Sequence, residues 1–468
     1  MKTAVIAVFD IGKTHIKLSA VDLQVGTLLA LQRTTNAVRQ DGLYPHVETD
    51  VIWAWLKATL KALATRFDIQ SIAVTTHGAT IACMDDIDLV LPIADYEYDG
   101  FAQTRSLYRP LRPAFEQSYS PELSAGLNLG AQLFWQQYCF PEQFARVTTL
   151  LTYPQYWGWR LTGVKASERT SLGCHTDLWA PDKDDFSTLV DQQNWRKLFP
   201  PLRAAGEPLA TILPELAQEL GLAEDCRVFN GIHDSNASLV PHLLHRSAPF
   251  GVISSGTWTI ITAVGAPLSG LNEQMDMLAN VSVFAQPVPS IRFMGGREWQ
   301  LLATDQPATQ NDVREVLAQQ VYAIPAFSNQ GGPFQHHQGY ICGPYEQLTA
   351  AQKTALATLY VALMSDECLT LQRQKGDLII EGAFAGNELY LQILATLRHQ
   401  QAVFFSRDET GTTIGTAMLA YQQNPWRINY QQVVMHQELY SMLQAYRHQW
   451  WQRCEGLTDR QVSANSVL

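Results

Sequence analysis

The stretch AVIAVFDIGKTHIKLSAVD, residues 4–22, decides how this chain folds. Six apolar residues lead into an Asp-x-Gly turn at Asp10 and Gly12, and a second, loosely alternating apolar run leaves the turn. This pattern predicts a buried strand, a tight turn and a returning strand. An aspartate at a strand end beside backbone N–H donors suits a phosphate and Mg²⁺ site. An ordinary β-hairpin at the start of a domain is the alternative interpretation of the same residues.

The segment Gly12-Lys13-Thr14 resembles the end of a P-loop, G-x-x-x-x-G-K-[ST]. The first glycine of that motif would have to stand at Ala7, in the middle of the predicted strand. Lys13 and Thr14 also open a strand where a P-loop requires a helix. The segment is therefore not a P-loop.

Composition limits the classes of function. The 468 residues are enough for two domains, and 46% hydrophobic with 16% charged residues indicates a folded chain. A net charge of −11 argues against a nucleic-acid partner. No apolar run approaches the roughly 18–20 residues that span a bilayer, and no signal peptide is visible, so no membrane partner is expected. Seven scattered cysteines without C-x-x-C favour reduced thiols and a cytoplasmic location.

The first half alternates strand and helix signals. Residues 28–34 suit a third strand, residues 51–67 have apolar side chains at helical spacing behind Thr49-Asp50 as a cap, and residues 71–75 form a short strand. This order predicts an α/β layout. Residues 100–225, rich in Pro, Trp, Tyr and Gln, are predicted as loops and short helices around a substrate.

The opening pattern is repeated later in the chain. Residues 251–264 again have an apolar strand, a turn with a glycine at Ser254-Ser255-Gly256-Thr257, and a second apolar strand. Two such hairpins, each opening an α/β half, predict an internal duplication with a cleft between the halves and a boundary near residues 240–248. In the second half, residues 377–380 form a strand that leads into Gly382, and helices are predicted at 356–371, 389–397 and 411–420.

Taken together, four motifs resemble the FGGY family of carbohydrate kinases from about residue 4 to residue 425. They are Asp10, Gly12 and Lys17; Gly231, His233, Asp234 and Ala237; Ser254-Ser255-Gly256-Thr257-Trp258; and Gly382 with Asn387. The His-Asp and Ser-Ser-Gly-Thr-Trp segments are most similar to the rhamnulokinase/fuculokinase-like branch. The resemblance implies an α/β, two-domain ribonuclease H-like fold of the actin/hexokinase/Hsp70 type, with the active-site cleft between duplicated domains.

The resemblance also implies a role for each domain. Residues 1–243 would bind the sugar and carry the first phosphate motif and the catalytic aspartate, and residues 244–468 would bind ATP. Three features depart from the family pattern: Lys13 replaces a small or hydroxyl residue, Ala383 replaces a second glycine, and residues 94–98 lack the arginine of the sugar segment.

The site residues follow from this resemblance. Asp234 would be the general base, and Asp10 would hold Mg²⁺ through water. The phosphates would be lined by Gly12, Lys13, Thr14, Lys17, Gly256 and Thr257, and the adenosine by Gly382, Ala383 and Asn387. The sugar would contact Thr76, His77, Gly78, Tyr96, His233, Asp234 and Arg297, with Trp258 and residues 293–299 as further candidates.

Structural alternatives remain for most of these residues. Asp234 suits a helix N-cap, His233 and Arg297 suit buried structural roles, Lys17 suits a solvated strand position, and each glycine suits turn chemistry.

The resemblance implies an ATP- and Mg²⁺-dependent kinase that phosphorylates a primary hydroxyl of a ketose, with L-rhamnulose or L-fuculose as the first expectation and a 1-phosphate as the product. A catalytically silent sugar- or nucleotide-binding regulator and an actin- or chaperone-like ATPase are the alternatives. The expected partners are small molecules, and a homodimer is left open.

Overall fold

The computed structural model describes residues 2–328, 330–335, 337–407, 411–421 and 426–464, with side chains described through residue 455. The chain forms two compact units. The first consists of Met1–Arg246, Ala279–Pro287 and Thr410–Ile428, and the second consists of Ser247–Leu278, Val288–Glu409 and Asn429–Leu468. Two short segments of the second half of the sequence thus belong to the first unit.

The first unit contains a seven-stranded sheet in the order β12-β13-β6-β1-β2-β3, with β14 also paired to β6. β1 is antiparallel to β2 and parallel to β6, and β13 and β14 are parallel to β6. The predicted hairpin and third strand are confirmed. The strands are β1 (Ala4–Ile11), β2 (His15–Asp22), β3 (Leu28–Thr35), β6 (Asp68–Thr76), β12 (Pro208–Thr211), β13 (Arg227–Phe229) and β14 (Ile232–His233).

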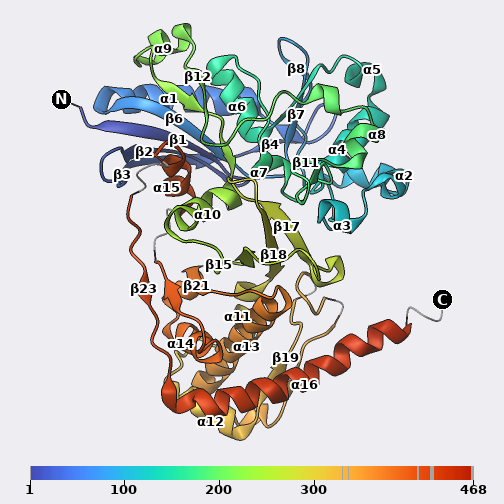
Figure 1. The fold of residues 1–468 in the computed structure, drawn as a ribbon, viewed down its shortest axis with the longest axis vertical. Coiled ribbons are helices and arrows are strands. Elements are labelled where there is room, and N and C mark those ends of the chain that lie inside the picture. The colour runs from blue at the N-terminus through green and yellow to red at the C-terminus, as the bar shows by residue number, and fades with distance from the viewer. Residues whose placement is uncertain (1, 329, 336, 408–410, 422–425, 465–468) are drawn as a thin grey trace. The chain divides into compact units, whose positions relative to one another are not determined.

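Helices cover both faces of this sheet because β1 is apolar on both sides (Figure 1). Val5, Ala7 and Phe9 pack with α1 (Thr49–Arg66), α6 (Tyr153–Thr162) and α9 (Pro214–Leu220). Ile6 and Val8 alternate to the opposite face, where they pack with α10 (Asp234–His245) and α15 (Gly411–Met418). A strand buried on both faces explains the continuous apolar run of residues 4–9.

The region 100–225 is more regular than the sequence suggested. It contains α4 (Leu129–Cys139) and α6, and β9 (Thr149–Thr152) joins β7 (Ile81–Met84) and β8 (Leu89–Leu91) in a three-stranded sheet. The shorter helices are α2 (Arg105–Tyr108), α3 (Phe115–Ser118), α5 (Pro141–Phe144), α7 (Arg169–Leu172) and α8 (Thr188–Gln192). Two-stranded pairs are β4 (Val38–Arg39) with β5 (His46–Val47), and β10 (Trp179–Ala180) with β11 (Asp185–Phe186).

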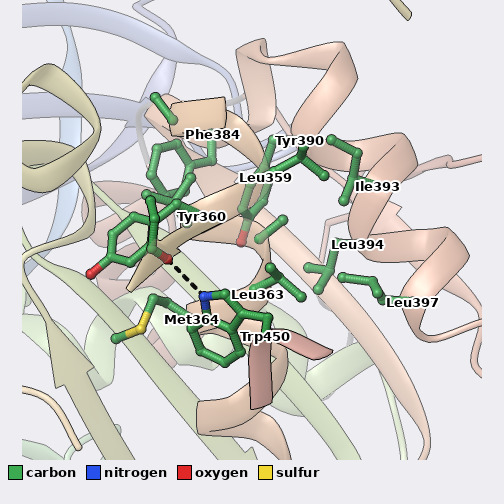
Figure 2. Close-up of a cluster of buried hydrophobic side chains, with 14 of the residues drawn as sticks. Leu359, Tyr360, Leu363, Met364, Phe384, Tyr390, Ile393, Leu394, Leu397 and Trp450 are labelled. Atoms are coloured by element: carbon green, nitrogen blue, oxygen red, sulfur yellow. Dashed lines mark hydrogen bonds between the residues drawn. The ribbon is translucent and has the colours of Figure 1, made fainter. Parts of the chain in front are cut away.

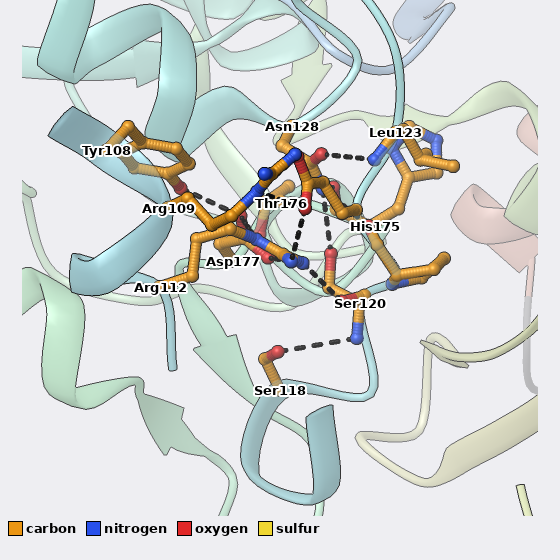
Figure 3. A network of polar contacts seen from close by, with 12 residues as sticks. Tyr108, Arg109, Arg112, Ser118, Ser120, Leu123, Asn128, His175, Thr176 and Asp177 are labelled. Carbon is orange, nitrogen blue, oxygen red and sulfur yellow. Dashed lines mark hydrogen bonds and ion pairs between the residues drawn. The ribbon is translucent and has the colours of Figure 1, made fainter. Parts of the chain in front are cut away.

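A buried polar network holds these connections in place, as Figure 3 shows. Asp177, whose side chain is inaccessible to solvent, accepts from Arg112 Nε at 3.0 Å and from the Tyr108 hydroxyl at 2.7 Å. Burial raises the pKa of Asp177, and the Arg112 guanidinium opposes that shift. The Asn128 side-chain amide donates to the Ser120 hydroxyl at 3.1 Å. The network ties residues 108–128 to residue 177 and so orders a region with few long elements.

The hairpin is repeated in a second seven-stranded sheet of order β17-β18-β16-β15-β21-β22-β23, whose strands belong to the second unit apart from residues 279–281 of β17 and Pro287 of β18. β15 pairs antiparallel with β16 and parallel with β21, as β1 does with β2 and β6. The strands are β15 (Phe250–Ser255), β16 (Thr259–Val264), β17 (Met277–Val281), β18 (Pro287–Phe293), β21 (Asp377–Gly382), β22 (Val403–Phe405) and β23 (Gln431–Gln432), and a small pair consists of β19 (Tyr322–Ile324) and β20 (Tyr340–Cys342). The matching pairings support the predicted duplication.

The core of the second unit forms around α13 (Ala350–Leu371), as Figure 2 shows. Leu359 and Leu363 of α13 pack in one buried cluster with Leu394 of α14 (Glu388–Leu397) and Trp450 of α16 (Tyr440–Ala464). The remaining helices are α11 (Gly295–Leu302) and α12 (Gln310–Gln319). Among the described residues, α13 is long and apolar enough to cross a membrane, but 83% of its apolar window is buried inside the protein, as in a core helix.

One local prediction is wrong. Helix α1 begins at Thr49 with Glu48 in the N-cap position, and no side chain caps it. Thr49 and Asp50 are thus helical residues, and buried apolar residues such as Ile52 and Leu56 stabilise the helix instead.

Candidate functional site

Three parallel strands of the first unit end at one edge of the sheet. Asp10 and Ile11 of β1 lie opposite Thr75 and Thr76 of β6, and His233 of β14 also lies opposite Thr76. The pairing places the ends of three distant segments side by side, and each segment is followed by polar residues. The carboxyl ends of parallel strands are where α/β folds bind ligands.

Asp234 is the first residue of α10, and its two carboxylate oxygens differ in environment. Oδ1 accepts from the Ser235 backbone N–H at 2.6 Å and lies 3.2 Å from His233 Nε2. Among the described residues, Oδ2 has no protein partner, and the side chain is 32% exposed. Burial raises the pKa of Asp234, an effect that His77 opposes. His233 occupies the N-cap position, so the cap interpretation of Asp234 is wrong.

His233 is fixed from several sides. Its Nδ1 lies 3.1 Å from the Asn236 side-chain amide nitrogen, and its backbone N–H donates to Thr170 Oγ1 at 3.2 Å. With the Asn236 amide in this orientation, its nitrogen donates to Nδ1, and Nε2 then carries the proton toward Asp234 Oδ1. Burial lowers the pKa of His233 to about 4, so the ring is neutral at physiological pH.

The buried carboxylate of Glu168 orients the Thr170 hydroxyl that contacts His233. Glu168 caps α7 by accepting from the backbone N–H groups of Thr170 and Ser171 at 2.8 and 3.1 Å. It also accepts from the Thr170 hydroxyl at 2.5 Å, which directs the Thr170 oxygen lone pairs toward the N–H of His233. Burial raises the pKa of Glu168 to about 7.

The residues predicted to contact the sugar at the end of β6 and after it have different environments. Thr76 is fully buried and its hydroxyl donates to the His77 carbonyl at 2.9 Å. The His77 ring meets the Tyr96 ring edge-on at 5.5 Å between centroids. A Cβ on Gly78 would lie 2.7 Å from His233 Nε2, so only glycine permits this approach. Burial lowers the pKa of His77 and raises that of Tyr96 to about 12.

Asp10, the predicted Mg²⁺ ligand, is a nearly buried carboxylate near the end of β1. It is 6% exposed, and Lys17 Nζ lies 3.2 Å from Oδ2. Burial raises the pKa of Asp10, and Lys17 opposes the shift. Among the described residues, no three His, Cys, Asp or Glu side chains form a metal cluster. Mg²⁺ at Asp10 would therefore depend on water and phosphate oxygens for its other ligands, which suits this ion.

The turn between β1 and β2 is closed by its own backbone. The Gly12 N–H donates to the His15 carbonyl at 3.0 Å, and Thr14 is exposed at the tip. Lys13 is paired with Asp95, and its Nζ lies 3.3 Å from Glu97 Oε2. Its ammonium group thus contacts carboxylates within the first unit.

The corresponding turn of the second unit is built in the same way. The Gly256 N–H donates to the Trp258 carbonyl at 2.8 Å, and Thr257 is exposed. Ser255 then joins this turn to the end of β21: its hydroxyl donates to the Glu381 carbonyl and accepts from the Phe384 N–H, both at 2.8 Å. Gly382 has φ +75°, and a Cβ there would lie 2.1 Å from the Ser255 carbonyl oxygen. Glycine is therefore required where the strand ends.

A cavity of about 660 Å³ lies in the second unit beyond this strand end. Asn387 lines it and caps α14 by accepting from the Tyr390 N–H at 3.1 Å. Gly382 and Ala383 are exposed on the segment that leads to it. Other lining residues are Trp299, Thr304, Pro307, Thr354, Gly386 and Leu389.

Arg297 lies in the first turn of α11 and is exposed, so the interpretation as a buried structural arginine is wrong. Its backbone N–H donates to the Thr257 carbonyl at 3.3 Å. The neighbouring Glu298 is buried and accepts from the Ser328 hydroxyl at 2.6 Å. Trp258 lies against the Arg292 guanidinium, 4.8 Å from the ring centroid.

Sequence reasoning missed several groups that contact these residues. Thr170, Cys174 and Asn236 contact His233, with Cys174 Sγ at 3.7 Å from Nε2, and Glu168 in turn accepts from the Thr170 hydroxyl. Asn236 had a signal, because it is three residues after His233 at a predicted helix start. The others come from remote parts of the chain and had none.

Comparison with known proteins identifies two family models in this chain. The N-terminal domain of the FGGY family of carbohydrate kinases matches residues 5–241, and the carbohydrate kinase FGGY C-terminal domain matches residues 247–427. A solved carbohydrate kinase from Novosphingobium aromaticivorans is 33% identical, covers 97% of this chain and 99% of its own, and superimposes with a TM-score of 0.92.

More distant relatives extend the comparison. L-fuculokinase from Escherichia coli (strain K12) is 29% identical over 271 residues, which are 56% of this chain and 57% of the relative, so the match spans little more than half of that enzyme. A ligand-bound xylulose kinase from Lactobacillus acidophilus is 13% identical, covers 97% of this chain and 98% of its own, and has a TM-score of 0.79, which shows a shared fold.

Proposed function

Because this chain belongs to the FGGY family of carbohydrate kinases, we propose that it transfers the γ-phosphoryl group of ATP to a hydroxyl of a ketose or related sugar. The α/β fold with two sheet-containing units of the actin/hexokinase type supports this proposal. The carboxylate geometry of Asp234 supports it most directly.

Asp234 is proposed as the general base. Oδ1 is held by the Ser235 N–H and by the neutral His233 ring, whereas Oδ2 is available to accept the proton of an attacking hydroxyl. A pKa raised by burial makes the ionised carboxylate a better proton acceptor. Phosphoryl transfer needs this orientation more than it needs a strong base, because its transition state is loose.

Asp10 is proposed to bind Mg²⁺ through water, with Lys17 setting the orientation of its carboxylate. The ion, when bound with ATP, neutralises phosphate charge during transfer. The turns at Gly12–Thr14 and at Gly256–Thr257 are proposed to face the phosphates, and the cavity at Asn387 is proposed to accept the adenosine.

The charge of the first unit's site favours an uncharged acceptor. Among the described residues of this site, four carboxylates, Asp10, Asp95, Glu97 and Asp234, interact with two lysines, Lys13 and Lys17. An acidic sugar such as an aldonate would be repelled, whereas ketose hydroxyls can donate to carboxylates. Because the curated relatives include L-fuculokinases, L-fuculose is the first candidate and L-rhamnulose the second, each giving the 1-phosphate.

The test is ADP release by the purified protein with ATP and Mg²⁺ over a panel of L-fuculose, L-rhamnulose, D-xylulose, glycerol and gluconate. We expect a ketose to raise ADP release well above the rate without acceptor, and gluconate to be inactive. Failure of every acceptor to raise the rate would overturn the proposed activity and favour a silent regulator. Preference for gluconate would overturn the argument from charge.

A further inference from the structure

We propose that Lys13 is a positioning residue for the sugar-binding loop, not a phosphate ligand. We call Asp95, Tyr96, Glu97 and Tyr98 the sugar loop. The inference rests on the proposed function for its kinetic consequences, but its structural part concerns only the first unit.

The backbone of Lys13 is anchored at both sides by Asn36. The Asn36 side-chain amide donates to the Gly12 carbonyl at 2.8 Å, and its backbone N–H donates to the Thr14 carbonyl at 2.9 Å. With the Gly12–His15 hydrogen bond, these contacts make the turn a rigid base for the lysine side chain. A long side chain loses less conformational freedom on pairing when its backbone is already fixed.

The ammonium group of Lys13 is directed entirely at the sugar loop. It is paired with Asp95, lies 3.3 Å from Glu97 Oε2, and stands 4.7 Å from the centroid of the Tyr96 ring. A lysine has three N–H donors, and two carboxylates and one ring face account for all three. Because the side chains of Lys13 and Asp95 are only 23% and 11% exposed, this pair is partly screened from water and is stronger than a surface pair, whereas Glu97 is 63% exposed and adds less.

The sugar loop is also restrained by its backbone, and its Tyr96 side chain contacts His77, a residue predicted to bind the sugar. The Asp95 N–H donates to the Pro45 carbonyl at 2.9 Å, and the Tyr96 carbonyl accepts from the Gly126 N–H at 2.8 Å, so the backbone is held at the first two residues of the loop. The Tyr96 ring contacts the His77 ring, and His77 interacts electrostatically with Asp234. Lys13 contacts the side chains of Asp95, Tyr96 and Glu97 and so restrains these three residues of the loop beside the turn after β1.

The alternative is a Lys13 that leaves the loop and contacts the γ-phosphate. That movement would leave Asp95, 11% exposed at its side chain, beside Glu97 without a cation. Separating a partly buried carboxylate from its partner is costly, and repulsion between the two carboxylates would add to the cost. In the proposed function, Lys17 and bound Mg²⁺ would therefore neutralise the phosphate charge at this turn.

Steady-state kinetics of Lys13→Gln separate the two roles. With L-fuculose, or the best ketose of the panel, we expect the sugar KM to rise about tenfold or more while the ATP KM stays within about twofold, since a lost positioning contact acts on one substrate. Lys13→Arg should recover most of the sugar affinity because it keeps the charge. Lys57→Gln, which removes an ion pair with Glu219 elsewhere in the unit, is the matched control and should change neither KM.

Amide hydrogen exchange tests the structural part without any substrate. In Lys13→Gln, peptides covering residues 95–98 should exchange faster than in the wild type, while peptides of β1 and β2 should not change. This readout stands even if the proposed kinase activity fails, so the two failures can be told apart. Unchanged exchange in the sugar loop, or an increase in the ATP KM without one in the sugar KM, would overturn the inference.

Discussion

Asp234 is the proposed general base because one of its carboxylate oxygens is restrained and the other is available. The restraint comes from the first turn of α10 and from a neutral histidine, and neither contact consumes Oδ2. The same residue is adjacent to the ends of β1 and β6, where Asp10 and His77 stand. In the proposed function, this arrangement places the general base near the carboxylate proposed to bind Mg²⁺.

Asp234→Asn tests the base. The amide keeps the shape of the side chain but cannot accept a proton, so we expect kcat to fall by about 10²–10⁴-fold with little change in the ATP KM. Asp225→Asn, at an exposed position of the same unit, is the control and should be fully active. A variant at Asp234 that keeps the wild-type kcat would remove this residue from the base role.

His233 gives the stability of the protein a defined pH dependence. Its pKa is lowered to about 4 in the folded state, whereas an unfolded histidine titrates near 6.5. Between these values the unfolded chain binds a proton that the folded chain does not, so stability is lost as the pH falls. From pH 7 to pH 5 the loss is on the order of 2 kcal/mol.

The thermal unfolding midpoint measures this effect. Between pH 7 and pH 5 the midpoint should fall more for the wild type than for His233→Gln, which has no ionisable group at this position. His448→Gln, at an exposed site, should behave as the wild type. Equal shifts for His233→Gln and the wild type would contradict the depressed pKa.

The two hairpins, β1–β2 and β15–β16, share a strand–turn–strand pattern that can be predicted from the sequence. In each, a glycine after the first strand donates its N–H back across the turn, to His15 in one case and to Trp258 in the other. Alternation and turn glycines are local signals, so both hairpins and the helices α13 and α14 could be predicted. The contacts of Ser255 with Glu381 and Phe384 could not, because they join residues 126 and 129 positions apart.

Gly382→Ala tests the close approach of β21 to β15. The added Cβ would lie 2.1 Å from the Ser255 carbonyl oxygen, and φ of +75° is strained for alanine. We expect a loss of stability of about 1–3 kcal/mol or more and a higher ATP KM. Gly386→Ala, where nothing lies within 4 Å of the new Cβ, should retain wild-type stability. Equal midpoints for the two variants would show that the strand end can move away.

The molecule consists of two units whose sheets repeat one strand pairing, and this much follows from the duplicated pattern in the sequence. The sequence did not reveal that residues 279–287 and 410–428 return to the first unit, because such returns depend on tertiary packing. The ion pairs of Lys13 with Asp95 and Glu97 were missed for the same reason, since 82 and 84 positions separate them. The predicted cleft between the halves stays a prediction.

Transfer of labelled phosphate tests the central claim most directly. The wild type and Asp234→Asn are incubated with γ-labelled ATP, Mg²⁺ and L-fuculose or the best ketose of the panel, and the products are separated. The proposed mechanism predicts that the wild type moves the label onto the sugar and that Asp234→Asn loses this product. Label found only in inorganic phosphate, or equal sugar phosphate from both proteins, would contradict it.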